Sequence, residues 1–367
     1  APLELNLGLA GTAARFLTAA ACFWPGTYRL TGEPRLLERP LRPLITTLQN
    51  AGAQLAPSDT PSGLPLLIQG NPHWKPTGLQ FPEEEPLTSS QFVSALMLLA
   101  PKLKTGTQLR WKGPVPSVSY LEWTQQMLAE QGYNWRLGPQ AATLESTPPV
   151  ALEASSTKSS LVAGDWSSAS YLLGLALLQG QAMQLTGLDL NAPQGDALLW
   201  KALAARWPGF ALKPTPNAQG VAFDFLPDKP HLLPAFDLDC ANWPDQAQTL
   251  AVLACFTSGV CLLTGLHTLA HKETDRLTAL QNELPKLGAR VERGEDWLRV
   301  FPGDKRSQPE SSPFIRSYND HRMALAFSLA AARLPEGVVL EEPAVVGKSW
   351  PGWWEALSGL GFGLAFE

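Results

Sequence analysis

The segment SSQFVSALMLLAPKLKTGTQLRWKGPVPSVSYLEWTQQMLAEQG, residues Ser89–Gly132, contains the pattern that predicts the fold. Two serines precede an apolar stretch, Gln91–Ala100, which we interpret as a helix buried on most of its faces. A short strand at Gln108–Trp111, a loop and a second helix follow. Gly132 comes where that helix ends, in the position where glycine tolerates a left-handed backbone.

The same order of features recurs about every 78 residues, which indicates an internal repeat. We interpret each repeat as a β-α-β-α-β-β module and count five modules along the chain. We expect the first helices to begin near Gly11-Thr12, Ser89-Ser90, Ser167-Ser168, Pro244-Asp245 and Asn319-Asp320. The second helices should end at glycines spaced 80, 77, 79 and 73 residues apart, namely Gly52, Gly132, Gly209, Gly288 and Gly361.

Other local patterns refine this expectation. Leucine alternates with polar residues or glycine over Leu3–Leu9, which predicts a half-buried strand. Pro285 lies inside the apolar stripe of a second helix and should kink or shorten it. The polar stretch Asp304–Pro313 is typical of a surface loop or hairpin tip.

One module cannot bury its apolar faces alone, so we expect the modules to form two lobes. A length of 367 residues also predicts two domains, at about 150 residues each. We interpret the polar run Ser155–Ser160 as the linker, which gives an N-terminal lobe at 1–157, with an incomplete first module, and a C-terminal lobe at 158–367.

Composition excludes several classes of protein. The chain is 45% hydrophobic and 17% charged, which is too apolar for a disordered protein. A net charge of −5 argues against general binding of nucleic acid, although a local basic cleft remains compatible with it. No uninterrupted apolar run approaches the ~18 residues of a membrane span, and a basic signal-peptide region is lacking. Four cysteines without CxxC spacing indicate buried thiols in a reducing compartment, hence the cytoplasm.

The motif KETDRL (Lys272–Leu277) places four ionisable groups within five residues at the start of a predicted helix. We expect Lys272 and Arg276, four residues apart, to share a helix face. Acids near the positive end of a helix are also typical of an ordinary solvated first turn. The motif alone therefore fits either a solvated helix start or an anion site that holds an acid and two cations.

The motif NDHRMA (Asn319–Ala324) precedes another apolar helix. An Asn or Asp there is a good N-cap, but capping does not explain His321 and Arg322. The planar fork of arginine suits phosphate and carboxylate groups. Two more helix starts are compatible with either a local structural role or an anion site. They are Ser89-Ser90-Gln91 and Gly11-Thr12-Ala13-Ala14-Arg15.

Basic residues recur at the same end of successive modules. Arg39 in Glu38-Arg39-Pro40 and Lys348 in Gly347-Lys348 both stand just before a second helix. If the modules share an orientation, helix N-termini and basic side chains converge on one anion-binding cleft. The basic residues of this expected cleft are Arg39, Lys272, Arg276, Arg322 and Lys348.

These motifs resemble the 5-enolpyruvylshikimate-3-phosphate (EPSP) synthase family, the 3-phosphoshikimate 1-carboxyvinyltransferases, in order and over essentially the whole chain. KETDR together with NDHRMA makes the resemblance specific. The stretches that carry it are AGTAARFL (Ala10–Leu17), TGEPRLLERPL (Thr31–Leu41), SSQFVSALMLLAP (Ser89–Pro101), GDWSSASYLL (Gly164–Leu173), PDQAQTLAVLA (Pro244–Ala254), KETDRL (Lys272–Leu277) and NDHRMALAFSL (Asn319–Leu329).

The resemblance implies an α/β (α+β) fold, the two-lobed enolpyruvyl transferase fold of three β-α-β-α-β-β modules per lobe, closing over a cleft. About five of the six modules are present. It implies transfer of the enolpyruvyl group of phosphoenolpyruvate to the 5-hydroxyl of shikimate 3-phosphate with release of phosphate, in the shikimate pathway of aromatic amino acid biosynthesis. It also implies no metal or organic cofactor, no nucleic-acid or membrane partner, and a cytoplasmic monomer.

The resemblance also assigns residue roles. Asp245 would accept the 5-hydroxyl proton, Lys272 would lie between the substrates, and Glu273 would donate a proton to the methylene carbon. Shikimate 3-phosphate would be held by Ser89, Ser90, Gln91, Ser117, Asp245 and Lys272, with Tyr120 nearby. Phosphoenolpyruvate would be held by Gly11, Arg39, Gln91, Arg276, Arg322 and Lys348.

The chain departs from the family pattern in three places. A PGSKS-type segment, whose Lys, Ser and Arg contact both substrates in the family, does not occur in these 367 residues. Leu9 stands where an Asn is common, and Thr268 stands where an Asn contacts shikimate 3-phosphate. We interpret the chain as either a fragment of an enzyme or a shortened relative, and we expect it alone to turn over poorly.

Two other functions are open at this stage. The related UDP-N-acetylglucosamine enolpyruvyl transferase has a reactive cysteine in a loop, and no cysteine of this chain lies in a matching loop. KETDR and NDHRMA also argue against that enzyme. A non-catalytic anion-binding protein would keep the fold and bind the ligands without turnover.

Overall fold

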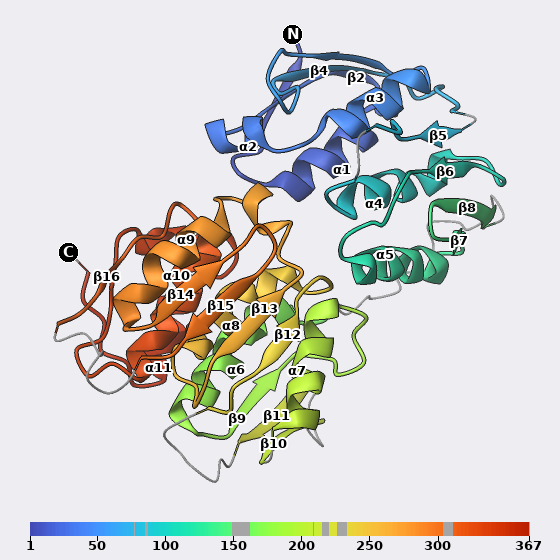
Figure 1. The fold of residues 1–367 in the computed structure, drawn as a ribbon. Helices are drawn as coiled ribbons and strands as arrows, with labels where there is room; N and C mark the ends of the chain where they lie inside the picture. The colour runs from blue at the N-terminus through green and yellow to red at the C-terminus, as the bar shows by residue number, and fades with distance from the viewer. Residues whose placement is uncertain are drawn as a thin grey trace. The chain divides into compact units, whose positions relative to one another are not determined.

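The computed structural model describes residues 1–76, 78–84, 87–148, 162–207, 209–214, 220–225, 233–303 and 311–366. The chain forms two compact units, unit 1 (Ala1–Leu161) and unit 2 (Val162–Glu367) (Figure 1). The boundary expected after residue 157 and the linker Ser155–Ser160 lie outside the described residues, as does most of the expected loop Asp304–Pro313.

Unit 1 contains two modules built on one plan. Its helices and strands are β1 (Leu3–Asn6), α1 (Gly11–Ala21), β2 (Gly26–Thr31), α2 (Pro34–Glu38), α3 (Arg42–Asn50), β3 (Gln54–Pro57), β4 (Leu66–Gly70), β5 (Leu79–Gln80), α4 (Gln91–Met97), the 3₁₀ helix η1 (Ala100–Lys102), β6 (Gln108–Arg110), α5 (Val118–Glu130), β7 (Asn134–Leu137) and β8 (Ala141–Ser146). The strand orders β1-β2-β4-β3 and β5-β6-β8-β7 are equivalent. In both sheets the first pair is parallel and the other two pairs are antiparallel.

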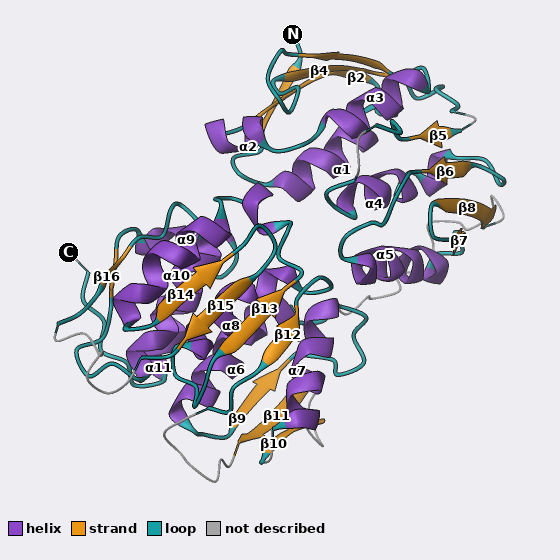
Figure 2. Ribbon diagram, in the orientation of Figure 1, coloured by secondary structure: helices purple, strands orange, loops and turns teal. Residues whose placement is uncertain are grey.

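Unit 2 continues the repeat, as the strands and helices in Figure 2 show. Its elements are α6 (Trp166–Gln179), β9 (Met183–Thr186), α7 (Gly195–Arg206), β10 (Phe210–Pro214), β11 (Gly220–Phe225), β12 (Asp237–Asp239), η2 (Pro244–Gln246), α8 (Ala247–Ala254), β13 (Cys261–Thr264), η3 (Leu269–His271), α9 (Arg276–Glu283), η4 (Leu284–Leu287), β14 (Arg290–Arg293), β15 (Leu298–Phe301), β16 (Phe314–Ile315), α10 (His321–Ser328), η5 (Leu329–Ala332), β17 (Val339–Leu340), η6 (Pro343–Lys348) and α11 (Trp353–Gly359).

The sheets of unit 2 follow the same plan to different extents. The order β12-β13-β15-β14 repeats that of unit 1. Within the described residues, the module before it contributes the three strands β10-β11-β9, and the module after it contributes the parallel pair β16-β17. The repeated α/β modules expected from the sequence are therefore confirmed.

The first helix of each module of unit 2 lies in the core. Helices α6, α8 and α10 pack together (Figure 1). Every residue of α8 is buried. In unit 1, α1 packs against α4 in a separate core. Burial of each large apolar side chain stabilises the folded state by about 1.5–3 kcal/mol. Helices that are apolar on all sides therefore lie in the core.

Local sequence signals explain where the helices begin. Asp165 caps α6 by accepting hydrogen bonds from the Ser167 and Ser168 N–H groups at 3.1 and 2.9 Å. Asp320 caps α10 through the Arg322 N–H at 2.9 Å. The expected helix starts are confirmed to within a few residues. The start of α8 differs slightly, since a 3₁₀ turn that begins at Pro244 precedes it.

Element ends also follow the sequence, with one correction to a helix and one to a strand. Pro285 converts the end of α9 into η4, as expected. The five predicted end glycines all have positive φ angles: Gly52, Gly132, Gly209, Gly288 and Gly361. The predicted helix Gln91–Ala100 ends as an α-helix at Met97. The predicted strand Leu3–Leu9 ends at Asn6, and Leu3 is 58% exposed.

Within the described part of the chain, no helix combines the length and apolar character needed to cross a membrane. All four cysteines are buried and free. Burial raises the pKa of the Cys22 and Cys240 thiols to about 12, which keeps both protonated at neutral pH.

Candidate active site

The starts of α8, α9 and α10 bring seven charged side chains together in unit 2. Asp245 lies in η2, directly before α8. Lys272 and Glu273 follow η3, and Arg276 is the first residue of α9. Lys272 therefore precedes the helix and does not share a helical face with Arg276, contrary to the expectation from their spacing. The remaining members are Asp320, Arg322 and, at the end of η6, Lys348.

Arg276 is the centre of this cluster. Its side chain is 1% exposed. It binds Asp320 with two hydrogen bonds, from Nε at 2.7 Å and Nη2 at 3.1 Å, and the Asp320 side chain is fully buried. Nη1 also donates to Asp245 Oδ1 at 2.8 Å, and Nη2 donates to Glu273 Oε2 at 2.9 Å. Burial alone would lower the pKa of Arg276, but these carboxylates outweigh it and raise the pKa above its ordinary value.

Asp245 is surrounded by cations. Its Oδ1 is 3.1 Å from Lys272 Nζ, and its Oδ2 is 3.5 Å from Arg322 Nη2. Burial would raise the pKa of Asp245, but Arg322, Lys272 and Arg276 together hold it well below its usual range. The carboxylate is therefore ionised at neutral pH, and its side chain is 23% exposed.

The cluster carries more positive than negative charge. Lys348 Nζ lies 2.7 Å from Glu273 Oε1, so Glu273 bridges Lys348 and Arg276. Four cations (Lys272, Arg276, Arg322, Lys348) and three carboxylates (Asp245, Glu273, Asp320) leave an excess of one positive charge. Burial, assisted by Arg276 and opposed by Asp245, lowers the pKa of Lys272. Such a cluster suits an anion that competes with the carboxylates for these cations.

His321 is neutral in this cluster. Burial, assisted by Arg322 and opposed by Asp320, lowers the pKa of His321 from 6.5 to about 4. An unfolded chain therefore binds a proton between pH 6.5 and 4 that the folded chain does not bind, and stability falls as the pH falls through this range. We expect a loss of about 2 kcal/mol in the free energy of unfolding between pH 7 and pH 5. Urea unfolding at both pH values measures it, and the variant His321→Gln should lose that part of the pH dependence. Equal dependence in both proteins contradicts the neutral state of His321.

Unit 1 contains a second group of basic side chains around Gly11. The guanidinium of Arg15 donates to Gln91 Oε1 at 2.8 Å and to the Pro40 carbonyl at 2.9 Å. Gln91 Nε2 in turn donates to Thr12 Oγ1 at 2.8 Å. Arg39 donates to the Leu9 carbonyl at 3.0 Å. The acceptors in these bonds are neutral oxygens, and both arginines are buried.

Gly11 leaves the space that the two arginines occupy. A Cβ atom at this position would lie 2.7 Å from Arg39 Cζ and Nη2 and 2.9 Å from Arg15 Nη1. We expect Gly11→Ala to displace the guanidinium groups and, through the phosphoenolpyruvate binding that the resemblance implies for Gly11 and Arg39, to raise the KM for phosphoenolpyruvate about 10-fold or more. Steady-state kinetics measures this effect. Gly359→Ala is the control, because a Cβ there meets no atom within 4 Å. Equal KM values for the two variants contradict a role for this space.

The expected shikimate 3-phosphate residues of unit 1 lie at the starts of two packed helices. Ser89, Ser90 and Gln91 are at the start of α4, and Ser117 is the N-cap of α5 with a positive φ of 55°. Tyr120 lies in the first turn of α5. The two helices are joined by a 2.9 Å hydrogen bond between the Ser94 and Thr124 hydroxyls.

The structure brings the predicted charged residues of unit 2 together, groups Gly11 with Arg39 and Gln91 in unit 1, and adds others that the sequence analysis did not assign. Arg15 joins the Gly11 group, and Asp320 anchors Arg276. Tyr171 accepts a 3.5 Å hydrogen bond from Arg322. Arg15 lies one helical turn after Gly11, a spacing that could have indicated it, whereas Asp320 has the ordinary signature of an N-cap.

The two unusual positions behave differently. Leu9 contacts Arg39 through its backbone carbonyl, which any residue supplies. The Thr268 hydroxyl is buried and has no hydrogen-bond partner among the residues that the structure describes.

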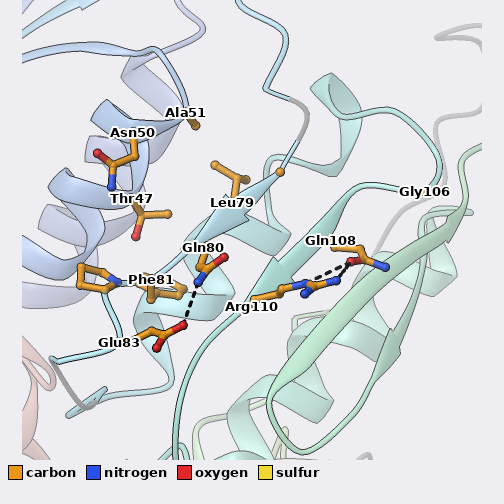
Figure 3. A pocket seen from close by; sticks show the side chains of 12 residues that line it. Thr47, Asn50, Ala51, Leu79, Gln80, Phe81, Glu83, Gly106, Gln108 and Arg110 are labelled. Carbon is orange, nitrogen blue, oxygen red and sulfur yellow. Dashed lines mark hydrogen bonds between the residues drawn. The ribbon is translucent and has the colours of Figure 1, made fainter.

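A separate hollow of about 640 Å³ lies in unit 1, beside β5, β6 and the end of α3 (Figure 3). Four of its polar side chains form two pairs: Gln80 donates to Glu83 at 3.4 Å, and Arg110 donates to Gln108 at 3.1 and 2.6 Å. The residues that line it are distinct from the predicted site residues. Over the described ranges, His, Cys, Asp and Glu side chains form no group of three or more that could hold a metal ion.

The fold is that of an enolpyruvyl transferase. The chain resembles the structure of EPSP synthase from Acinetobacter baumannii with a TM-score of 0.72 and 22% sequence identity, over 97% of this chain and 78% of that one. It also resembles the enolpyruvyl transferase NikO from Streptomyces tendae, with a TM-score of 0.64 and 16% identity, over 94% and 75% of the two chains. These likenesses establish the fold.

Sequence comparison identifies the family. The model of the family EPSP synthase (3-phosphoshikimate 1-carboxyvinyltransferase) matches residues 1–357, and this chain belongs to that family. A 3-phosphoshikimate 1-carboxyvinyltransferase of Bacteroides fragilis is 35% identical over 98% of this chain and 84% of its own length. That of Laribacter hongkongensis is 37% identical over 97% and 79%.

Proposed function

We propose that this chain transfers the enolpyruvyl group of phosphoenolpyruvate to the 5-hydroxyl of shikimate 3-phosphate with release of phosphate, a reaction of the shikimate pathway. The observation that supports this most strongly is the cluster at the starts of α8, α9 and α10. There an ionised aspartate and four cations lie together in a chain of the EPSP synthase family. Both substrates are anions, and such a cluster can neutralise them.

We assign the proposed binding residues within each unit by itself. In unit 1 we assign Gly11, Arg39 and Gln91 to phosphoenolpyruvate, and Ser89, Ser90, Gln91 and Ser117 to shikimate 3-phosphate. In unit 2 we assign Arg276, Arg322 and Lys348 to phosphoenolpyruvate, and Asp245 and Lys272 to shikimate 3-phosphate. The helix-start positions of the serines support the assignment, because free N–H groups at helix starts favour phosphate. Arg276 has a second role as the anchor of three carboxylates.

The chemistry needs a base on the hydroxyl and an acid at the alkene. Asp245 accepts the proton of the 5-hydroxyl while the hydroxyl oxygen bonds to the central carbon of phosphoenolpyruvate. Glu273 gives a proton to the methylene carbon. Glu273, which is a carboxylate after donating its proton, then takes a proton back from the methyl group of the tetrahedral adduct. The bond to phosphate breaks, the double bond is restored, and the departing phosphate takes the proton that Asp245 accepted. Lys272, 3.1 Å from Asp245, is placed to neutralise charge beside both substrates.

Binding of the substrates should change the two carboxylates. Cations beside a carboxylate favour its ionised form, and Glu273 contacts both Arg276 and Lys348. When Lys348 moves to the anionic phosphoenolpyruvate, Glu273 can take up the proton that it must donate. In the same way, Asp245 becomes a stronger base when Arg322 pairs with the substrate, because a cation that favours the ionised carboxylate is then no longer beside it.

We further propose that the protein acts as a monomer in the cytoplasm. Free, buried cysteines support a reducing compartment. The acidic chain, with a net charge of −5, supports small-molecule anions over nucleic acid as ligands.

Calorimetric titration of the full chain tests the proposed function. We expect saturable binding of shikimate 3-phosphate and, in its presence, of phosphoenolpyruvate, but no binding of UDP-N-acetylglucosamine. Phosphate release that requires both substrates separates an enzyme from an anion-binding relative. Saturable binding of the nucleotide sugar without binding of shikimate 3-phosphate contradicts the proposal.

A further inference from the structure

The turn that leads into α10 has a strained backbone. Tyr318 and Asn319 have φ angles of 56° and 54°, and the Asp320 N–H donates to the Ser317 carbonyl at 3.0 Å. Positive φ at both central residues is the pattern of a type I′ turn, where glycine and asparagine are favoured. A bulky residue such as tyrosine is uncommon in this conformation. Strain of this kind persists when surrounding contacts hold it and is concentrated at functional sites.

Glu283, at the end of α9, supplies these contacts. Its side chain is 1% exposed. Oε1 accepts a 2.8 Å hydrogen bond from the Tyr318 hydroxyl, and Oε2 accepts a 2.9 Å bond from the Arg316 N–H. Lys286 Nζ lies 2.6 Å from the same carboxylate and also donates to the Phe314 carbonyl at 2.9 Å. One buried carboxylate therefore binds both the segment before the turn and the strained residue within it.

The opposite end of α9 binds the last residue of the turn. Arg276 holds Asp320 with two hydrogen bonds, and Asp320 accepts the Arg322 N–H. The turn Ser317–Asp320 is thus fixed at its start by the last residue of α9 and at its end by the first. A small change at Tyr318 would be transmitted to Asp320 and Arg322, which lie two and four residues after it in the chain.

We propose that Glu283 and Tyr318 are positioning residues for the reaction. Their hydrogen bond holds the left-handed turn so that Asp320 meets Arg276 and the Arg322 guanidinium lies beside Asp245. They act through Arg322 and touch neither substrate. The inference rests on the proposed function for the role of Arg322, but the geometry of the turn can be measured independently of activity.

The first test removes one oxygen atom. Tyr318→Phe keeps the ring and deletes the hydroxyl that binds Glu283. Because a hydrogen bond to a carboxylate stabilises by more than a neutral one, hydrogen exchange at the Asp320 and Arg322 N–H groups of the full chain should become about 10-fold faster. Exchange in α8 should not change. Tyr28→Phe is the matched control, because it deletes a hydroxyl that donates at 3.0 Å to the Pro25 carbonyl in unit 1. Unchanged exchange at Asp320 and Arg322 overturns the proposal.

The second test separates positioning from a purely structural role. In Tyr318→Phe we expect the KM for phosphoenolpyruvate to rise about 10-fold, with a change of less than about twofold in the KM for shikimate 3-phosphate. Glu283→Gln keeps an acceptor for Tyr318 and should raise this KM less than Glu283→Ala. In Tyr318→Phe, faster hydrogen exchange together with equal changes in the KM for phosphoenolpyruvate and the KM for shikimate 3-phosphate would overturn the positioning role. If the unsubstituted chain binds neither substrate, the proposed function fails, and the exchange experiment still decides whether Glu283 holds the turn.

Discussion

Replacement of Arg276 by methionine should lower the free energy of unfolding by about 3–5 kcal/mol and abolish measurable turnover. The substitution removes the partner of the buried Asp320 and one partner each of Asp245 and Glu273. Three carboxylates then repel one another in a region from which Asp320 cannot reach solvent. Equilibrium unfolding in urea and a phosphate-release assay measure the two effects.

A second substitution identifies the cause of this loss. In Arg276→Met/Asp320→Asn the buried negative charge is gone, while asparagine can still cap α10. We expect the double variant to recover part of the lost stability but none of the activity. Arg136→Met is the control, because Arg136 pairs with Glu145 at the surface and such pairs contribute less than about 1 kcal/mol. Unfolding of Arg276→Met at the urea concentration of the unsubstituted chain would contradict the central place of Arg276.

Replacement of Asp245 by asparagine should reduce kcat by about 10²- to 10⁴-fold, the range typical of a lost general base. Asparagine has nearly the same shape but cannot accept the hydroxyl proton. The substitution also removes a negative charge beside Lys272 and Arg322, so the affinity for anionic phosphoenolpyruvate should be equal or greater. Stopped assays for kcat and calorimetry for binding measure the two quantities separately.

Asp189→Asn provides the control for Asp245. Asp189 belongs to the same unit and accepts a local hydrogen bond from the Asn191 N–H at 2.8 Å. Its replacement should leave kcat and both KM values unchanged. A kcat for Asp245→Asn within about threefold of the unsubstituted chain would exclude Asp245 as the base.

Much of the fold could be predicted from the sequence because the signals are local. An aspartate before an apolar helix, as at Asp320, acts through N–H groups two residues away. Glycines such as Gly288 end helices because they adopt a left-handed backbone without steric cost. The apolar character of α8 on all sides predicted its place in the core. In each case the determining contact lies within a few residues.

The contacts within the candidate site are not local, and the sequence could indicate them only by composition. Arg276 and Asp320 are 44 residues apart, and Arg15 and Gln91 are 76 residues apart. No periodicity selects one carboxylate among several as the partner of a given arginine. The role of Glu283 could not be predicted from the sequence either. Its i,i+3 spacing to Lys286 is typical of a surface ion pair, whereas the Glu283 side chain is buried.

The short helix α2 was also not predicted. Pro34–Glu38 is too short for a clear hydrophobic period, and its first-turn proline is compatible with a loop as well as a helix. Its position matters, because Arg39 follows it directly and reaches the Leu9 carbonyl.

Phosphorus NMR of the full chain with both substrates tests the central claim most directly. The account predicts that inorganic phosphate and an enolpyruvyl ether of shikimate 3-phosphate appear together in equal amounts, even if slowly, and that Asp245→Asn suppresses both signals. Phosphate formed from phosphoenolpyruvate without the second substrate, or two substrates that bind nowhere on the chain and remain unchanged, would contradict it.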